Sequence, residues 1–168
     1  MRVHLYTGNG GGKTTAALGL ALRALGHNKK VIVIQFMKGR KGTGEYLVKK
    51  KLGPKYEIYQ FGRPNFVNLR NPAKEDIDIA KKGLAFTEKL LRKKPDILIL
   101  DEINVAVYAK LITTNEIKKF LKKVPKKTWV VMTGRYAPKS MWKISDFVTE
   151  FVDRKSPKKM HYEKGIEW

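Results

Sequence analysis

The chain has 168 residues, 42% of them hydrophobic, and its 36 lysine and arginine residues against 15 aspartate and glutamate residues give a net charge of +21. This length favours one domain over residues 1–168, and no apolar block reaches the roughly 18 to 20 residues of a membrane span. The sequence has no cysteine, which excludes disulfides, thiolate metal sites and a cysteine nucleophile. The first residues lack a signal- or transit-peptide pattern, so we expect a cytoplasmic protein with no membrane partner.

The positive charge attracts anions, including nucleotides, carboxylate-rich metabolites and nucleic acid, but does not choose among them. Lysine runs such as Lys49-Lys50-Lys51 and Lys122-Lys123 fall at predicted helix ends or on solvent faces. Because no aromatic residues are interleaved with these runs, we favour a solvated, lysine-rich surface over a nucleic-acid footprint.

Clusters of β-branched and aliphatic residues alternate with helical patterns along the chain. They predict strands over residues 3–6, 31–35, 56–61, 97–100, 128–132 and 147–152. Apolar periodicity between them predicts helices over residues 14–25, 45–51, 74–93, 114–122 and 138–144. Glycine, proline and asparagine residues favour a loop with a functional role over residues 61–73. The alternation predicts a doubly wound α/β fold, with a mainly parallel sheet of about six strands covered on both faces.

A glycine-rich segment between the first predicted strand and the first predicted helix indicates a phosphate cradle. Its glycines let backbone N–H groups approach a polyphosphate, Lys13 adds a positive charge, and Thr14 offers a hydroxyl ligand for Mg²⁺. The predicted ATP site comprises Gly8, Asn9, Gly10, Gly11, Gly12, Lys13, Thr14 and Thr15. Thr7 stands where the usual phosphate loop has its first glycine, so this loop is effectively one residue short. A dinucleotide-binding loop would need a small residue in place of Lys13.

Two carboxylates, Asp101 and Glu102, follow an apolar strand. Like charges at a strand end repel each other unless a cation or hydrogen bonds compensate, so we predict that they bind Mg²⁺ together with Thr14. A second interpretation, compatible with the first, is that Asp101 caps a helix whose first turn contains Glu102.

Arg135 follows another apolar strand, and the carboxyl ends of such strands form the ligand-binding edge of an open α/β sheet. It either contacts phosphate or is a solvated arginine in a surface turn. The sequence offers no Ser-His-Asp set, and we expect structural roles for the three scattered histidines, His4, His27 and His161.

Several segments together resemble the ATP:corrinoid adenosyltransferases of cobalamin synthesis and salvage. In chain order they are Gly8–Ala17, Arg23–His27, Gln35–Gly39, Leu100–Asn104, Thr133–Arg135 and Lys164–Trp168. The resemblance implies a RecA-like three-layer P-loop fold that transfers the 5′-deoxyadenosyl group of ATP to the Co(I) of a reduced corrinoid and releases triphosphate. It also implies a homodimer, Mg²⁺, and a reductase that supplies the Co(I) corrinoid. The corrinoid is then the nucleophile, and Lys13, Thr14 and Glu102 align and stabilise the departing triphosphate.

Two departures from the family pattern stand out. Gly11 replaces a common lysine, which we expect to affect phosphate affinity rather than reaction type. Residues 62–67 replace an aromatic pair associated with the corrinoid, and Phe66 is the one aromatic residue among them. It either contacts the corrinoid or serves ordinary packing.

Two other functions fit parts of the pattern. A P-loop kinase or nucleotide-handling ATPase would also end a strand with Asp-Glu, although thymidine-kinase-like enzymes often carry a zinc ribbon that a cysteine-free chain lacks. A RecA-like ATPase that binds nucleic acid would show affinity that falls steeply with salt. We do not expect a nucleic-acid partner.

Overall fold

The computed structural model describes residues 1–65, 67–157 and 163–166. The strands in these ranges are β1 (Arg2–Thr7), β2 (Val31–Phe36), β3 (Tyr56–Phe61), β4 (Ile97–Asp101), β5 (Trp129–Thr133) and β6 (Phe147–Glu150). The helices are α1 (Lys13–Gly26), α2 (Gly44–Leu47), α3 (Lys49–Leu52), α4 (Lys74–Leu90), α5 (Ile103–Tyr108), α6 (Thr114–Leu121) and α7 (Lys139–Trp142). A 3-10 turn, Leu91–Lys93, extends α4.

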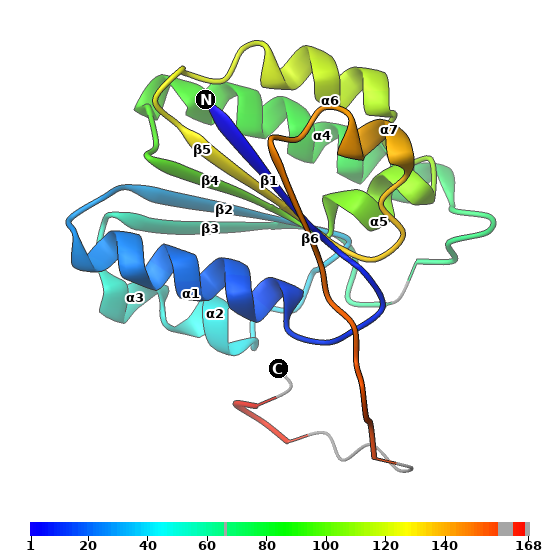
Figure 1. Cartoon of the computed structure of the whole chain (residues 1–168), viewed down its shortest axis with the longest axis horizontal. Coiled ribbons are helices and arrows are strands. Elements are labelled where there is room, and N and C mark those ends of the chain that lie inside the picture. Colours follow the sequence, from blue (N-terminus) through cyan, green and yellow to red (C-terminus); the bar gives the residue numbers. More distant parts are fainter. Residues whose placement is uncertain (66, 158–162, 167–168) are drawn as a thin grey trace.

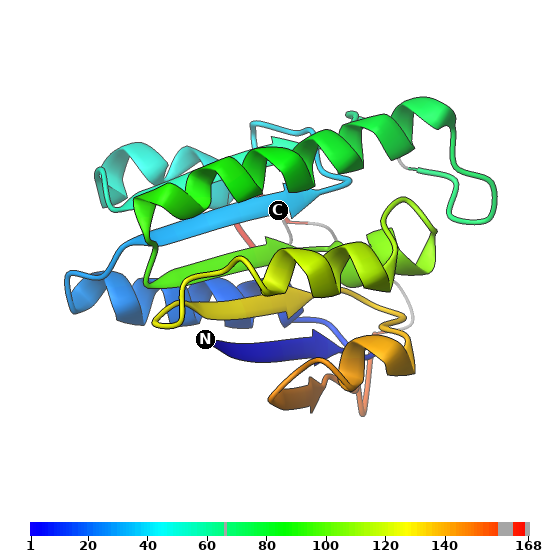
Figure 2. The same cartoon turned by 90° about the horizontal axis from the view of Figure 1, so that it is seen from above.

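The described strands form one parallel sheet in the order β3-β2-β4-β5-β1-β6. Helices α1, α2 and α3 cover one face, and α4, α5, α6 and α7 cover the other (Figure 1). The view from above shows the long helix α4 running along the strands on its face (Figure 2). The predicted doubly wound fold is therefore confirmed, with a sheet that is parallel throughout these strands.

Alternation along the central strands divides the core between the two helical layers. Ile32, Ile34 and Leu98 belong to the buried cluster beneath α4–α6, whereas Val33 and Ile99 belong to the cluster beneath α1. Successive side chains of a strand point to opposite faces, so a strand covered on both faces is apolar along its whole length. Each fully buried aliphatic side chain contributes about 1.5–3 kcal/mol. This burial fixes the strands whose ends carry the site.

Some predicted elements differ in extent from the observed ones. The helix predicted over residues 45–51 is divided at Val48 into α2 and α3, and the strand predicted to reach residue 152 ends at Glu150. Helix α5 was not predicted. It is six residues long and almost wholly buried, so its sequence lacks the polar face that reveals a helix. The loop predicted after Phe61 is confirmed for residues 62–65 and 67–73.

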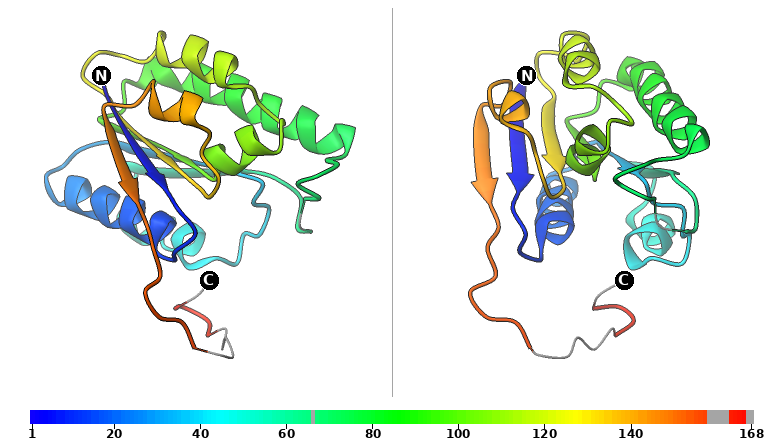
Figure 3. Two further views of the ribbon diagram at one scale, coloured as in Figure 1. Left: turned by 45° about the vertical axis from the view of Figure 1, so that its right-hand side comes forward. Right: turned by 90° about the vertical axis from the view of Figure 1, so that its right-hand side faces the viewer.

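The chain continues beyond β6 as an irregular segment that passes the end of β1 (Figure 3). The strand order sets the ends of β2, β4, β5 and β1 side by side at the same edge of the sheet. In an open α/β sheet this is the edge at which ligands bind. No helix within the described residues is long and apolar enough to cross a membrane.

Candidate active site

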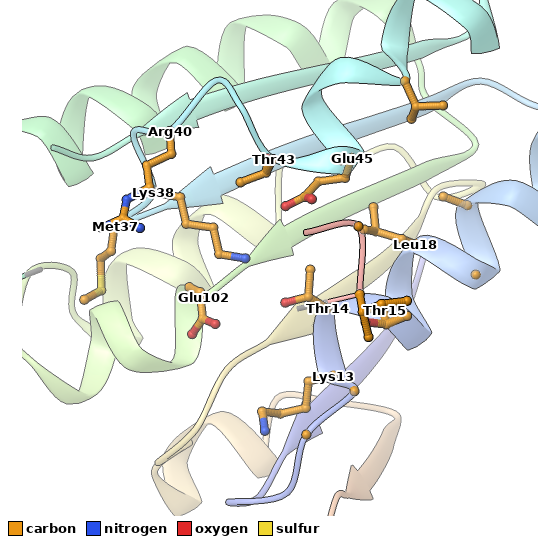
Figure 4. Close-up of a pocket in the computed structure, with 18 of the residues that line it drawn as sticks. Lys13, Thr14, Thr15, Leu18, Met37, Lys38, Arg40, Thr43, Glu45 and Glu102 are labelled. Atoms are coloured by element: carbon orange, nitrogen blue, oxygen red, sulfur yellow. The ribbon is translucent and has the colours of Figure 1, made fainter. Parts of the chain in front are cut away.

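A cavity of about 890 Å³ opens at the carboxyl edge of the sheet. Figure 4 shows Lys13, Lys38 and Glu102 on its walls, contributed by three different elements or loops. Among the residues predicted for the site, the following line it: Gly10, Gly11, Gly12, Lys13, Thr14, Thr15, Glu102 and Arg135. One flank of the cavity is apolar and is formed by α1 and α3 with the residue before α3: Leu18, Leu22, Leu25, Val48 and Leu52. Phe66 lies outside the described residues.

The phosphate loop places Lys13 at the start of α1. Gly12 precedes the helix with a left-handed φ of 88°, and Lys13 is only 7% exposed. Its ammonium donates to the Gly10 carbonyl. Burial lowers the pKa of Lys13, as does the positive charge of Arg135, while Glu102 and Asp153 act in the opposite direction. A buried cation whose hydrogen bond goes to a neutral carbonyl retains its attraction for an anion.

Gly8 and Gly10 pack closely against the chain segment that follows β6. A Cβ atom on Gly10 would lie 2.8 Å from the carbonyl carbon of Phe151, and one on Gly8 would collide with the backbone of the same residue. The Gly10 N–H donates to the Phe151 carbonyl at 2.9 Å, and the Phe151 N–H donates to the Thr7 carbonyl at 2.8 Å. These two glycines therefore admit the chain that follows β6, and the Gly10 amide is used within the protein.

Gly11 and Gly12 are the open part of the loop. A Cβ atom on Gly11 would have no neighbour within 4 Å, and one on Gly12 would meet only the ring of Phe151, at 3.9 Å. Both residues are exposed and line the cavity. The Gly11 N–H donates to the carboxylate of Asp153 at 3.0 Å, so this amide already binds an anionic group.

The carboxylate of Asp101 is fully buried and accepts four hydrogen bonds. Oδ1 accepts from the hydroxyls of Thr14 at 2.8 Å and Thr133 at 2.6 Å. Oδ2 accepts from Nε2 of Gln35 at 3.0 Å and from Nζ of Lys38 at 2.8 Å. Burial alone would raise the pKa of Asp101, but the charge and hydrogen bond of Lys38 and the two hydroxyl donors outweigh it and lower the pKa.

Asp101 is the last residue of β4, and the cap of the following helix α5 is Glu102. The interpretation in which Asp101 caps the helix and Glu102 lies in its first turn is therefore wrong. The Asp101 side chain instead bonds to Thr14 and Thr133, because the start of α1 and the end of β5 meet the end of β4 at this edge.

Glu102 adopts the left-handed conformation, with φ of 60°. Its N–H donates to the Thr133 hydroxyl at 3.1 Å. A Cβ atom on Gly134 would lie 3.1 Å from Oε2 of Glu102, so the glycine makes room for the carboxylate. Burial raises the pKa of Glu102, and the negative charge of Asp101 raises it further. Left-handed conformations of residues other than glycine concentrate at functional sites.

The oxygen atoms at the cavity fit a Mg²⁺ ion that is also bound by substrate phosphates. All four acceptor positions of the Asp101 carboxylate are used, one of them by the Thr14 hydroxyl, while Thr14 and Glu102 themselves line the cavity. The described residues contain no group of three or more His, Asp or Glu side chains able to hold a metal ion. Mg²⁺ is usually held by one or two protein oxygens together with substrate phosphates and water.

Lys38 and Glu45 complete the polar wall of the cavity, and the fully buried Gln35 bonds to Glu45. None of the three was predicted as a site residue, although Gln35 and Lys38 fall within Gln35–Gly39, one of the segments that resemble the family. Lys38 follows β2 and is 29% exposed at its side chain. Gln35 bridges Asp101 and Glu45, donating to the latter at 2.9 Å. Position was the available signal for two of them, because Gln35 lies near the end of β2, Lys38 follows that strand, and β2 lies beside β4. Glu45 belongs to α2 and had no such signal.

An ion pair holds the segment that follows β3. The guanidinium of Arg63 donates from Nε and Nη2 to the two oxygens of Asp76, each at 2.8 Å, and Asp76 is 5% exposed. Gly62 packs on the backbone of Met37, where a Cβ atom would lie 2.8 Å from its Cα. Arg63, Pro64 and Asn65 line the cavity. This segment is thus fixed both to α4 and to the loop after β2.

A parallel doubly wound sheet, a glycine-rich Gly-Lys-Thr loop between β1 and α1, and acidic residues at the end of a neighbouring strand define a P-loop protein. The sequence matches the family model of the ATP:corrinoid adenosyltransferases BtuR/CobO/CobP over residues 1–168, and the chain belongs to this family. The resemblance drawn from the sequence is confirmed.

Three relatives carry the name corrinoid adenosyltransferase. One from Sinorhizobium sp is 34% identical over 167 residues, covering 96% of this chain and 78% of the relative. One from Pseudomonas aeruginosa is 32% identical over 168 residues, covering 98% and 82%. One from Escherichia coli K12 is 30% identical over 164 residues, covering 97% and 80%.

Proposed function

We propose that this enzyme transfers the 5′-deoxyadenosyl group of ATP to the Co(I) of a reduced corrinoid and releases triphosphate. The observation that carries the proposal is the shape of the cavity. Its polar side holds Lys13, Thr14 and Glu102, and it continues beyond them along an apolar flank and to the segment at Arg63. A site for phosphate transfer alone needs the first part, whereas a bulky second substrate needs the rest.

The backbone amides of Gly11 and Gly12, the start of α1 and the ammonium of Lys13 bind the triphosphate in this proposal. Backbone N–H groups at a helix start and a buried lysine stabilise the charge that grows on the triphosphate as it departs. Thr14 and Glu102 hold Mg²⁺, which would neutralise part of that charge. Arg135, exposed at the rim of the cavity, adds a second cation for the phosphates.

The protein supplies alignment rather than a nucleophile. The electron pair of Co(I) forms the Co–C bond at C5′ while the C5′–O bond breaks and its electron pair leaves with the triphosphate. No proton transfer is required in this step, so no side chain has to act as a base. Holding the two substrates in line contributes most of the acceleration available to such an enzyme.

We place the corrinoid against the segment that contains Arg63, Pro64 and Asn65, with Phe66 as its aromatic contact. The Arg63–Asp76 ion pair supports this placement because it makes the segment a rigid wall. The homodimer and the external reductase that the family resemblance implies belong to the same proposal. The reductase delivers the Co(I) state, for which the described residues provide no redox group.

Anaerobic incubation with Mg-ATP and a chemically reduced corrinoid tests the proposal. We expect loss of the Co(I) absorbance with formation of an adenosylated corrinoid and triphosphate in equal amounts. A P-loop kinase or ATPase would release ADP instead. Formation of ADP, or the absence of an adenosylated product with both cobalamin and cobinamide, would contradict the proposal.

A further inference from the structure

The segment that follows β6 lies on the phosphate loop and brings a carboxylate to it. Phe151 is fixed by two backbone hydrogen bonds, one to Thr7 and one from Gly10. Two residues later, Oδ1 of Asp153 accepts the Gly11 N–H at 3.0 Å. The negative charge of Asp153 also acts on Lys13, whose pKa it raises against the effect of burial.

The Asp153 carboxylate thus binds one group that we assign to the triphosphate, the Gly11 N–H, and its charge acts on a second, Lys13. Gly11 is the residue of the loop at which an added Cβ atom would have no neighbour within 4 Å, and Lys13 is the cation of the same loop. A carboxylate and a phosphate oxygen are both anionic acceptors, so both cannot take one N–H hydrogen without strong repulsion. Binding of a polyphosphate at Gly11 therefore requires the carboxylate to move away.

The local structure makes such a movement easy. Asp153 is exposed and lies beyond the last regular element, whereas Phe151 remains held through its backbone. Rotation of the Asp153 side chain into solvent breaks one hydrogen bond and leaves the anchored chain in place. The carboxylate regains its hydration on leaving, so its displacement costs little.

We propose that Asp153 is a resident anion of the phosphate loop that sets the affinity for polyphosphates by competing for the Gly11 amide. This inference rests on the proposed function, because it presumes that the loop binds a triphosphate. The competition weakens the binding of ATP and of the triphosphate product alike. Since the carboxylate returns to Gly11 when the loop empties, it favours release of the product.

Equilibrium binding to the full chain, measured by calorimetry, separates this role from a structural one. The probes are inorganic tripolyphosphate, ATP and adenosine. We expect Asp153→Ala to bind tripolyphosphate and ATP about five-fold more tightly than the unmodified protein, because a charge-assisted contact at an exposed site is lost. Asp153→Asn, which keeps the acceptor oxygen and loses the charge, should show a smaller gain. Binding of adenosine should not change.

Glu150→Gln is the matched control, since it removes one negative charge from the same chain segment without removing a contact to Gly11. An equal gain in Glu150→Gln would show a general charge effect and overturn the proposal. Equal or weaker binding of tripolyphosphate by Asp153→Ala, in a protein that still transfers adenosyl groups, would overturn this inference alone. Failure of the unmodified protein to bind either tripolyphosphate or ATP would overturn the proposed function as well.

Discussion

The two sides of the site are built on opposite principles. Around Asp101 every acceptor is used: two hydroxyls, an amide and an ammonium converge on a carboxylate with no exposed surface. In the phosphate loop, Gly11 is exposed, and its N–H is bonded to the carboxylate of Asp153, which belongs to a solvent-facing segment. The hydrogen bonds around Asp101 are buried and fix the side chains of this closed side, whereas a ligand can replace the hydrogen bond between Gly11 and Asp153.

The same contrast separates two neighbours in the chain. Asp101 and Glu102 are adjacent carboxylates, yet the pKa of Asp101 is lowered and that of Glu102 is raised. Donors surround Asp101, while Glu102 is affected mainly by burial and by the charge of Asp101. Adjacent groups with opposite shifts indicate different roles, one structural and one directed at the ligand.

The largest expected effect is on the closed side. Asp101→Ala leaves Lys38 without its counter-ion and three further donors without an acceptor, so we expect the free energy of unfolding to fall by about 3 kcal/mol. Urea denaturation at neutral pH measures this loss. Asp78→Ala, at an exposed position of α4, is the control and should change the stability by less than about 0.5 kcal/mol. If the two substitutions lowered the free energy of unfolding equally, the hydrogen bonds around Asp101 would not be the stabilising side of the site.

The pH dependence of stability sharpens the same comparison. Because the folded-state pKa of Asp101 lies below its ordinary value of 3.8, its stabilisation is complete above that value and is lost as the pH falls through the folded-state pKa. The difference in stability between the unmodified protein and Asp101→Ala should therefore shrink as acid is added below pH 3.8. A stability difference that stays constant as the pH falls would contradict the lowered pKa of Asp101.

An intermediate effect is expected at Glu102. In Glu102→Gln we expect kcat/KM for adenosyl transfer to fall about 10- to 100-fold, because a ligand of Mg²⁺ is lost. The stability at neutral pH should rise, since a pKa raised by burial means that the ionised carboxylate is unfavourable in the folded state. Steady-state kinetics and urea denaturation of one variant thus test both statements. Loss of stability together with activity would make Glu102 a second structural carboxylate.

The smallest effect is expected at the wall that we assign to the corrinoid. Arg63→Lys keeps the charge but loses the two-pronged contact to Asp76, so the segment at Pro64 becomes less rigid. We expect the KM for the corrinoid to rise about three-fold while the KM for ATP stays unchanged. Steady-state kinetics with each substrate varied in turn distinguishes this from a general loss of folding, which would lower kcat for both.

The contrast also explains which parts of the site were predictable from sequence. Residues 8–15 are contiguous, so their motif can be recognised in the sequence alone. The apolar run that ends at Asp101 likewise shows where a buried strand ends. The Gly11–Asp153 contact joins residues 142 positions apart, and Lys38 reaches Asp101 across 63 positions. Both depend on the strand order, which places β6 beside β1 and β2 beside β4. Local periodicity predicts the strands and leaves this order open.

The glycines of the loop carry a related lesson. Sequence alone assigned Gly8, Gly10, Gly11 and Gly12 a common role, since each lacks a Cβ atom. The structure divides them, because the backbone after β6 fills the space beside the first two and leaves the last two open. A missing side chain indicates a close approach without saying whether the approaching group is a ligand or the protein itself.

The central claim is that the phosphate loop serves adenosyl transfer, and single-turnover kinetics of Lys13→Ala test it most directly. The variant is mixed anaerobically with Mg-ATP and a reduced corrinoid, beside Lys29→Ala, which removes an exposed lysine that does not line the cavity. We predict that Lys13→Ala forms the Co–C bond at least about 100-fold more slowly, while Lys29→Ala matches the unmodified protein. An unchanged rate in Lys13→Ala would contradict the claim.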